Sequence, residues 1–260
     1  MKNAKFIVLA ALAAFSARAE DPASGATPPP PVPFVVACVG DSITAGGADS
    51  YPALLQKELG EGWSIRNFGV NSRTARRDGK EFDGRPGNLD YRETSAYRQS
   101  LACRPDAVIL LLGTNDSKPA NWEGTGEAFR EGFASLAADY LALDPQPELV
   151  IGVSPTVKGG GWTYLVTEEI VGGGVAPFQR AFAAEKNLPL VDCRAVLDPH
   201  LDTAYSGDGL HPNASGRALL AGAFAAKLRE LEPGLASRRA AREADAAEEA
   251  EPAPPAEPGA

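Results

Sequence analysis

Five short runs rich in Val, Ile and Leu recur along the chain, and each is continuous rather than alternating with polar residues. Continuous apolar runs of this length are typical of strands that are covered on both faces. Between them, apolar residues recur with helical spacing, and one more such segment follows the fifth run. The pattern predicts strands at residues 34–39, 64–68, 107–112, 148–153 and 188–191. It predicts helices at residues 51–59, 91–102, 126–143, 166–186 and 214–231.

Strands that alternate with helices predict an α/β fold with right-handed crossovers, a parallel sheet and helices on both of its faces. In such a sheet, ligands bind beyond the carboxyl ends of the strands. Glycines and polar residues stand at this position after the first three predicted strands: Gly40-Asp41-Ser42, Gly69, and Gly113-Thr114-Asn115-Asp116. The sequence therefore indicates that the chemistry of the protein lies at this edge of the sheet.

The two ends of the chain differ from the part that the predicted strands and helices cover. Residues 1–19 begin with Lys2 and Lys5, continue as an apolar run and end in Ala17-Arg18-Ala19, which is the pattern of a secretory signal peptide. The apolar run is shorter than the roughly 20 residues that a membrane span needs, so we expect a secreted or periplasmic protein without such a span. Residues 20–33 are a predicted Pro-rich linker, and residues 232–260 are a predicted disordered tail rich in Ala, Glu and Pro. A single folded domain, residues 34–231, remains.

Charge and cysteine content exclude few classes of function. The chain has 34 acidic and 25 basic residues, which argues against nonspecific binding to nucleic acid. Its three cysteines, Cys38, Cys103 and Cys193, lie within or beside apolar runs, and we interpret them as buried free thiols, although one pair could form a disulfide. These features leave the oligomeric state open.

Acyl transfer by a serine needs a nucleophile, a general base within hydrogen-bonding reach and a carboxylate that orients the base. The chain has two histidines, so the choice of base is narrow. His211 lies between the last strand and the last helix, three residues after Asp208, and Gly209 allows the bend that brings the carboxylate to the imidazole. His200 lies in a proline-broken loop and is interpreted as a surface or loop-packing residue. Ser42 stands at the turn after the first strand and is the predicted nucleophile.

The same edge of the sheet offers donors for the oxyanion that forms during ester hydrolysis. We expect the amides of Ser42 and Gly69 and the side-chain amide of Asn115 to provide them. Each residue also has a plain structural explanation, because Ser42 could cap a helix, Gly69 could serve a tight turn and Asn115 could close an Asx-turn. Asp41 and Asp116 are interpreted as carboxylates that shape the loops.

Taken together, these motifs resemble those of the SGNH hydrolases, also described as GDSL-like esterases and lipases. Four segments match in the order that this superfamily shows: residues 39–44, 67–71, 113–116 and 208–213. One departure is Ile43, where the name GDSL implies Leu. The resemblance implies a flavodoxin-like three-layer α/β/α sandwich with a five-stranded parallel sheet, and no metal or organic cofactor. It also implies residue roles: Ser42 as nucleophile, His211 as general base and acid, Asp208 as its partner, and Ser42, Gly69 and Asn115 as the oxyanion hole.

The run 113–119, followed by Asn121 and Trp122, is similar to bacterial carbohydrate and sialate O-acetylesterases. This likeness implies an exported serine esterase that removes acetyl groups from a small-molecule or polysaccharide ester. Trp122 and Trp162 could stack on a sugar, although a Trp in a loop is often a packing residue. Arg73 opens a basic stretch, residues 73–92, that could favour an acidic sugar, although a solvated loop explains it as well. Two other functions stay open: a lysophospholipase or thioesterase for longer acyl chains, and a carbohydrate-binding module without turnover.

Overall fold

The computed structural model describes residues 32–81, 85, 87–158 and 165–249. The predicted signal peptide and nearly all of the predicted linker lie outside these residues. The described chain is built on five strands: β1 (Phe34–Gly40), β2 (Trp63–Gly69), β3 (Ala107–Leu111), β4 (Glu148–Val153) and β5 (Leu190–Asp192).

These strands form one sheet in the order β2-β1-β3-β4-β5, and every neighbouring pair is parallel. The direction of winding reverses between β1 and β3, so the loops that follow these two strands diverge and leave room for a ligand. The predicted α/β fold with a five-stranded parallel sheet is confirmed.

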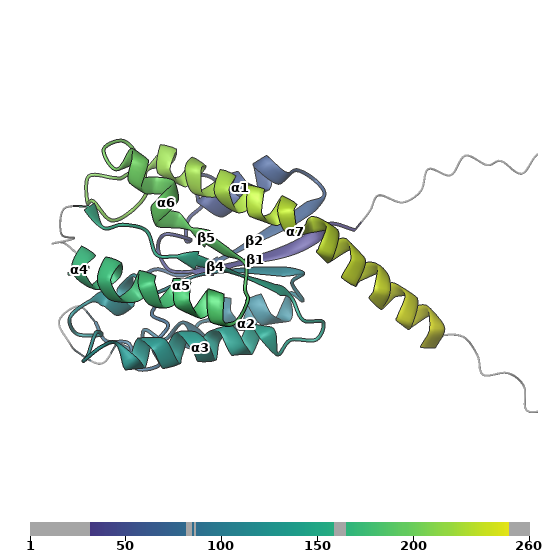
Figure 1. The fold of residues 1–260 in the computed structure, drawn as a ribbon, viewed down its shortest axis with the longest axis horizontal. Coiled ribbons are helices and arrows are strands. Elements are labelled where there is room, and N and C mark those ends of the chain that lie inside the picture. Colours follow the sequence, from purple (N-terminus) through teal and green to yellow (C-terminus); the bar gives the residue numbers. More distant parts are fainter. Residues whose placement is uncertain (1–31, 82–84, 86, 159–164, 250–260) are drawn as a thin grey trace, which may run out of the picture. The chain divides into compact units, whose positions relative to one another are not determined.

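Helices cover both faces of the sheet and complete a three-layer arrangement (Figure 1). One face carries α1 (Tyr51–Leu59), α6 (Cys193–Leu197) and α7 (Ala214–Glu249). The other carries α2 (Ser95–Ala102), α3 (Glu127–Leu141) and α5 (Ala176–Glu185). Short helical turns lie at Tyr91–Glu93, Asn115–Ser117, Glu168–Ile170 (α4) and Asp198–His200, and a π-helical turn lies at Val171–Val175.

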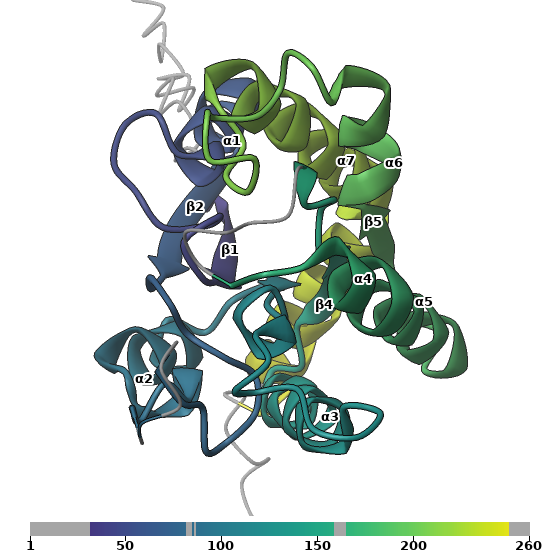
Figure 2. The ribbon, with the colours of Figure 1, turned by 90° about the vertical axis from the view of Figure 1, so that its left-hand side faces the viewer.

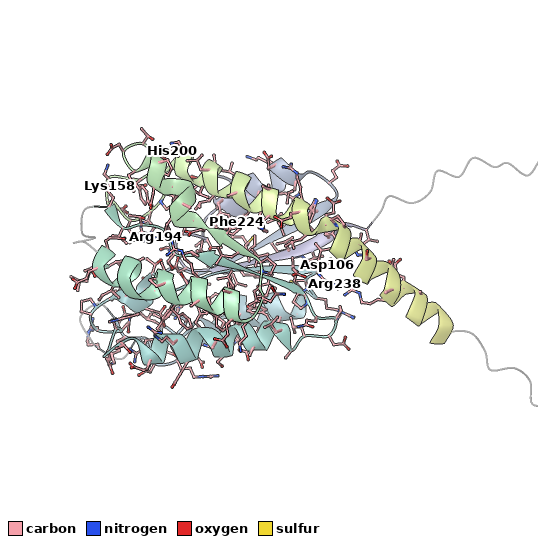
Figure 3. The ribbon with its side chains drawn as sticks, viewed as in Figure 1. Asp106, Lys158, Arg194, His200, Phe224 and Arg238 are labelled. Carbon is pink, nitrogen blue, oxygen red and sulfur yellow. The ribbon has the colours of Figure 1, made fainter. Side chains whose placement is uncertain are left out.

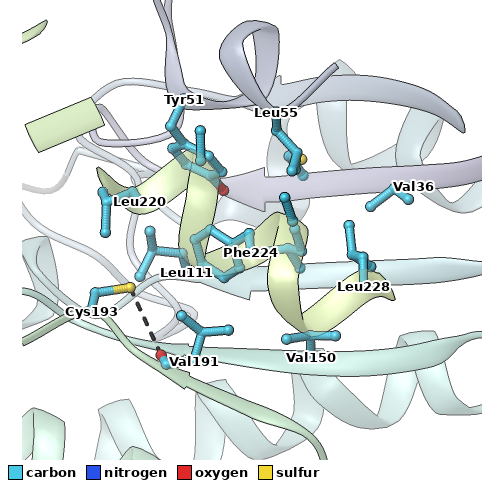
Figure 4. Packing of buried hydrophobic residues seen from close by; sticks show 14 of the residues in the cluster. Val36, Tyr51, Leu55, Leu111, Val150, Val191, Cys193, Leu220, Phe224 and Leu228 are labelled. Carbon is cyan, nitrogen blue, oxygen red and sulfur yellow. Dashed lines mark hydrogen bonds between the residues drawn. The ribbon is translucent and has the colours of Figure 1, made fainter. Parts of the chain in front are cut away.

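The core consists of two apolar layers, one on each face of the sheet, because successive side chains of a strand point in opposite directions. Val36 and Cys38 of β1 pack towards α1 and α7, where Phe224 lies in the middle of the cluster (Figure 4). Ala37 and Val39 pack towards the opposite helices. Full burial of a side chain such as Phe224 stabilises the fold by about 1.5 to 3 kcal/mol.

α7 corrects one prediction about the end of the chain. The helix continues beyond residue 231 to Glu249, so the predicted disorder from residue 232 is wrong as far as Glu249, and residues 250–260 lie outside the described part. Pro233 lies inside this helix. A proline inside a helix ordinarily kinks it, because proline has no N–H to donate and its ring clashes with the preceding turn. Figure 1 shows α7 changing direction between its first half on the sheet and its second half.

Arginine contacts hold the second half of α7 against the amino-terminal edge of the sheet. Arg239 forms an ion pair with Asp106 at 2.7 Å, and its guanidinium lies 4.3 Å from the centre of the Phe34 ring. Arg238 pairs with Glu148 at 2.5 Å, and Figure 3 shows Arg238 and Asp106 at the same end of the sheet. Within the described ranges, no helix combines the length and apolar character that crossing a membrane requires.

Candidate active site

Ser42 and His211 come from opposite ends of the chain and meet at the carboxyl edge of the sheet, the side that faces the viewer in Figure 2. Ser42 lies in the turn that follows β1, and His211 lies in the loop before α7. The Ser42 Oγ atom is 2.9 Å from His211 Nε2, and His211 Nδ1 is 2.6 Å from Asp208 Oδ2. The three side chains that the sequence singles out thus form one hydrogen-bonded series.

The loop from Asp208 to His211 is bent so that the carboxylate faces the imidazole. Asp208 Oδ1 accepts the amides of Leu210 and His211, both at 3.0 Å. Gly209 has a φ of +68°, and a Cβ atom there would lie 2.0 Å from the Lys158 carbonyl oxygen, so a side chain does not fit. Partial burial opposes ionisation of Asp208, but the hydrogen bonds from His211 and the two amides outweigh it and lower the pKa of this carboxyl.

A second carboxylate, Asp41, shapes the turn that carries Ser42. Its Oδ1 atom accepts the Ile43 amide at 3.0 Å, and its carbonyl oxygen accepts the amides of Thr44 and Ala45. Burial raises the pKa of Asp41 to about 6, while the Ile43 amide and attraction to His211 act in the opposite direction. The local fold of Asp41 therefore fits the predicted role of a loop-shaping carboxylate.

Asn115 and Asp116 tie the loop after β3 to its neighbours. Asn115 Nδ2 donates to the Arg73 carbonyl oxygen at 3.2 Å and makes a longer contact of 3.4 Å with Asp41 Oδ2. Asp116 accepts the amides of Ala75 and Arg76 at 3.0 and 2.9 Å, and its burial raises its pKa to about 6. These contacts hold the long loop after β2 beside Ser42.

A cavity of about 160 Å³ opens beside Ser42. Of the described residues, mostly polar side chains and one leucine line it: Ser42, Asn71, Ser72, Asn115, Lys118, Leu210 and His211. The catalytic candidates Ser42 and His211 and the predicted oxyanion donor Asn115 are therefore brought together at one small opening.

Gly69, the third predicted oxyanion donor, does not line this cavity. Its amide donates to Asn67 Oδ1 at 2.9 Å, and a Cβ atom at Gly69 would lie 2.2 Å from the Ala45 nitrogen. Gly69 thus allows the end of β2 to pack closely against the turn that follows Ser42. Ser72 lines the cavity instead, with a φ of +65° that is uncommon for a residue other than glycine. Its amide has no hydrogen-bond partner in the part of the chain that the structure describes.

The predicted sugar-binding residues lie away from the cavity or outside the described residues. Trp122 packs against Phe129, and its ring lies so close to Gly126 and Gly174 that a Cβ atom at either would be 2.4 Å from it. These contacts fit the interpretation of Trp122 as a packing residue. Arg73 Nη1 donates to the Asn88 carbonyl oxygen at 2.7 Å, and Arg73 is not among the residues that line the cavity. Trp162 lies outside the described residues.

Sequence reasoning missed four residues that line the cavity: Asn71, Ser72, Lys118 and Leu210. Asn71, Lys118 and Leu210 lie inside the segments that resemble the family motifs, but the local sequence does not show where their side chains point. The positive φ of Ser72 has no signal in its residue type. Among the described residues, no group of three or more His, Cys, Asp and Glu side chains could hold a metal ion.

A serine hydroxyl, an imidazole and a carboxylate that are hydrogen-bonded in series form the arrangement of a serine hydrolase. Residues 38–219 match the model of the GDSL-like Lipase/Acylhydrolase family, so the chain belongs to this family of carboxylic ester hydrolases. The resemblance to SGNH hydrolases is confirmed by this match.

Individual relatives agree with the family. An acetylxylan esterase of Xylanibacter ruminicola is 30% identical over 75% of this chain and 43% of its own length. The chain spans less than half the length of the curated relatives that it matches. The aryl esterase of M. smegmatis shares the fold with a TM-score of 0.60 at 20% identity, covering 76% of this chain and 99% of that one. A carbohydrate acetylesterase family member of Sinorhizobium meliloti does so with a TM-score of 0.59 at 21% identity, covering 76% and 98%.

Proposed function

We propose that this protein is an exported esterase that removes acetyl groups from carbohydrates through an acyl-enzyme. The observation that carries the proposal is the series Ser42, His211 and Asp208, with separations of 2.9 and 2.6 Å, beside a small polar cavity. The likeness to an acetylxylan esterase supports a carbohydrate ester as substrate. The signal-peptide pattern of residues 1–19 supports export.

In this mechanism Ser42 Oγ attacks the ester carbonyl while His211 Nε2 accepts the serine proton. His211 then returns that proton to the leaving sugar oxygen, and the acetyl group stays on Ser42. Water attacks the acyl-enzyme in the second half, with His211 again as base, and releases acetate. Asp208 keeps Nδ1 of the imidazole as a donor and stabilises the positive charge that His211 gains.

The oxyanion of each tetrahedral intermediate needs donors that face the cavity. We assign this role to the amides of Ser42 and Ser72 and to the side chain of Asn115, because these three residues line the cavity. Ser72 takes the place that Gly69 holds in the sequence prediction. Loss of one such donor typically costs about 2.7 to 4 kcal/mol of transition-state stabilisation.

The cavity favours a short acyl group. Its volume of about 160 Å³ is below the roughly 300 to 1,000 Å³ of pockets that enclose drug-sized ligands. Among the described residues that line the cavity, Leu210 is the one apolar side chain, so this part of the lining offers no long apolar groove for an octanoyl chain. This geometry favours acetyl esters over the substrates of a lysophospholipase or thioesterase.

The test is hydrolysis of p-nitrophenyl acetate, butyrate and octanoate together with acetate release from an acetylated xylo-oligosaccharide. We expect kcat/KM to fall from acetate to octanoate by at least roughly tenfold, since a long chain would remain exposed to water. Ser42→Ala should reduce all turnover by on the order of 10⁵-fold or more without a change in circular dichroism. The matched control is Ser95→Ala, because Ser95 is an exposed hydroxyl at the start of α2 and does not line the cavity.

Three results would contradict the proposal. Turnover that survives in Ser42→Ala would remove Ser42 as nucleophile. Preference for octanoate would favour the lipase or thioesterase function, and absence of turnover for every ester would favour a binding module.

A further inference from the structure

Lys118 is a cation in an unusual position. The residue is only 6% exposed, yet it lines the cavity together with Ser42 and His211. Buried lysines are almost always paired, because an ammonium that leaves water without a partner is costly. In the described part of the chain, the Lys118 ammonium makes no hydrogen bond or ion pair.

Two of the acidic groups that act on Lys118 through space, Asp41 and Asp116, accept hydrogen bonds from backbone amides. Asp41 accepts the Ile43 amide, and Asp116 accepts two backbone amides from the loop after β2. Burial lowers the pKa of Lys118, while Asp41, Glu81 and Asp116 act in the opposite direction. The Lys118 ammonium can therefore attract an anion, while Asp41 and Asp116 already accept hydrogen bonds from backbone amides.

The basic stretch 73–92 does not supply this cavity with another lining cation. Arg76 pairs with Asp78 at 2.6 Å, and Lys80 pairs with Glu123 at 2.7 Å. Arg77 donates to the Ser135 hydroxyl at 3.0 Å. These side chains fasten the loop after β2 to its surroundings, so the cation offered to a ligand at Ser42 comes from the loop after β3.

We propose that Lys118 determines substrate specificity by binding an anionic group, a carboxylate on an acidic sugar whose acetyl ester lies at Ser42. This inference rests on the proposed function. A substrate carboxylate in the cavity would form an ion pair with the Lys118 ammonium, which has none within the described residues. This ion pair would lie beside the ester that reacts at Ser42. If Lys118 merely balanced the charge of Asp41, its loss would affect neutral and anionic esters alike.

The first experiment compares acetate release from O-acetylated methyl glucuronoside and from O-acetylated methyl glucoside, acetylated at the same hydroxyls. We expect wild type to favour the glucuronoside by roughly fivefold to tenfold in kcat/KM, mainly through KM, as a partly buried ion pair allows. Lys118→Met should bring the ratio close to one. Lys80→Met removes a nearby cation that pairs outside the cavity, and it should keep the wild-type ratio.

A second experiment does not depend on turnover of a sugar ester or on a variant that folds. Sodium glucuronate and glucose are compared as inhibitors of p-nitrophenyl acetate hydrolysis by wild type. We expect competitive inhibition by glucuronate at a concentration at least roughly fivefold lower than for glucose, and a smaller difference at high salt.

Equal inhibition by the two sugars would overturn the role of Lys118. So would a loss in Lys118→Met that is the same for both acetylated substrates. If wild type hydrolyses p-nitrophenyl acetate but releases no acetate from any sugar, the carbohydrate function fails, while selective inhibition by glucuronate still supports the anion site.

Discussion

Asp116 is a carboxylate whose charge is costly in the folded protein. Its side chain is fully buried, and burial raises its pKa from 3.8 to about 6 although two amides donate to it. The folded state therefore holds the Asp116 proton more tightly than the unfolded state does. The resulting stabilisation is fully present below about pH 4 and is lost as the pH rises through about 6.

Asp116→Asn tests this linkage, because the amide cannot ionise. At about pH 4 the variant should be less stable than wild type, since it places an NH₂ group opposite one of the donating amides. The difference should shrink by on the order of 2 to 3 kcal/mol between about pH 4 and pH 7, because wild type alone has an ionised buried carboxylate at the higher pH. Urea unfolding over this pH range measures the difference.

Asp202→Asn is the matched control, because Asp202 forms an exposed ion pair with Lys158 and its pKa is lowered rather than raised. The difference in unfolding free energy between Asp202→Asn and wild type should not shrink as the pH rises. A pH-independent difference for Asp116→Asn would contradict the raised pKa of Asp116.

For single residues, the sequence predicts the position of side chains that directly follow a strand or lie a few residues from their partner. Ser42 directly follows β1, and the three-residue step from Asp208 to His211 fixes their proximity, so both could be predicted. Gly69 was expected at the cavity and Ser72 was not. Which residue of a loop reaches the cavity depends on φ angles such as the +65° of Ser72, and residue type does not encode that angle.

Helices and strands were predictable where one pattern covered the whole element. α1 and β4 have the predicted bounds. The predicted helix 166–186 is instead α4, a π-helical turn and α5, because three consecutive glycines, Gly172 to Gly174, weaken the helix at its centre. The glycines also leave space for the Trp122 ring against Gly174, a contact between distant segments that periodicity does not contain.

α7 shows how tertiary contacts override composition. Its second half contains Pro233 and many Ala and Glu residues, which favoured disorder in the sequence. Leu235 is nevertheless buried in the core, and Arg239 contacts both Asp106 and the Phe34 ring. Contacts to residues more than a hundred positions earlier hold the helix, so a local pattern could not predict it.

Arg239→Ala tests whether these contacts stabilise the fold. Arg239 and Asp106 are both largely buried, and the Phe34 ring lies beneath the guanidinium. We expect a loss of about 1 to 2 kcal/mol in the free energy of unfolding, from the ion pair and the cation–π contact together. Arg229 lies on the same helix as Arg239 and forms a half-exposed ion pair with Glu58 of α1. Arg229→Ala should cost less than about 0.5 kcal/mol. Equal losses in the two variants, measured by urea unfolding, would contradict a stabilising role for the second half of α7.

At the scale of the whole molecule, the three free cysteines report how well the two apolar layers exclude solvent. Cys38 and Cys193 are fully buried between the sheet and the helices on the α7 side, and burial raises the pKa of both thiols. Cys103 is half-buried at the end of α2, and its Sγ atom donates to the Ser100 carbonyl oxygen. Because the thiolate is the reactive form, the three residues should differ strongly in reactivity.

We expect a chromogenic disulfide reagent to label Cys103 first in the native protein. Cys38 and Cys193 should react at least roughly 10³-fold more slowly, because a reagent reaches them only when the fold opens and open molecules are rare. All three thiols should react at once in denaturant without reductant. Cys103→Ser is the control, since it should abolish the fast phase alone. Fast reaction of Cys38 or Cys193 would mean that the layer between α7 and the sheet opens locally, and two thiols missing in denaturant would mean a disulfide.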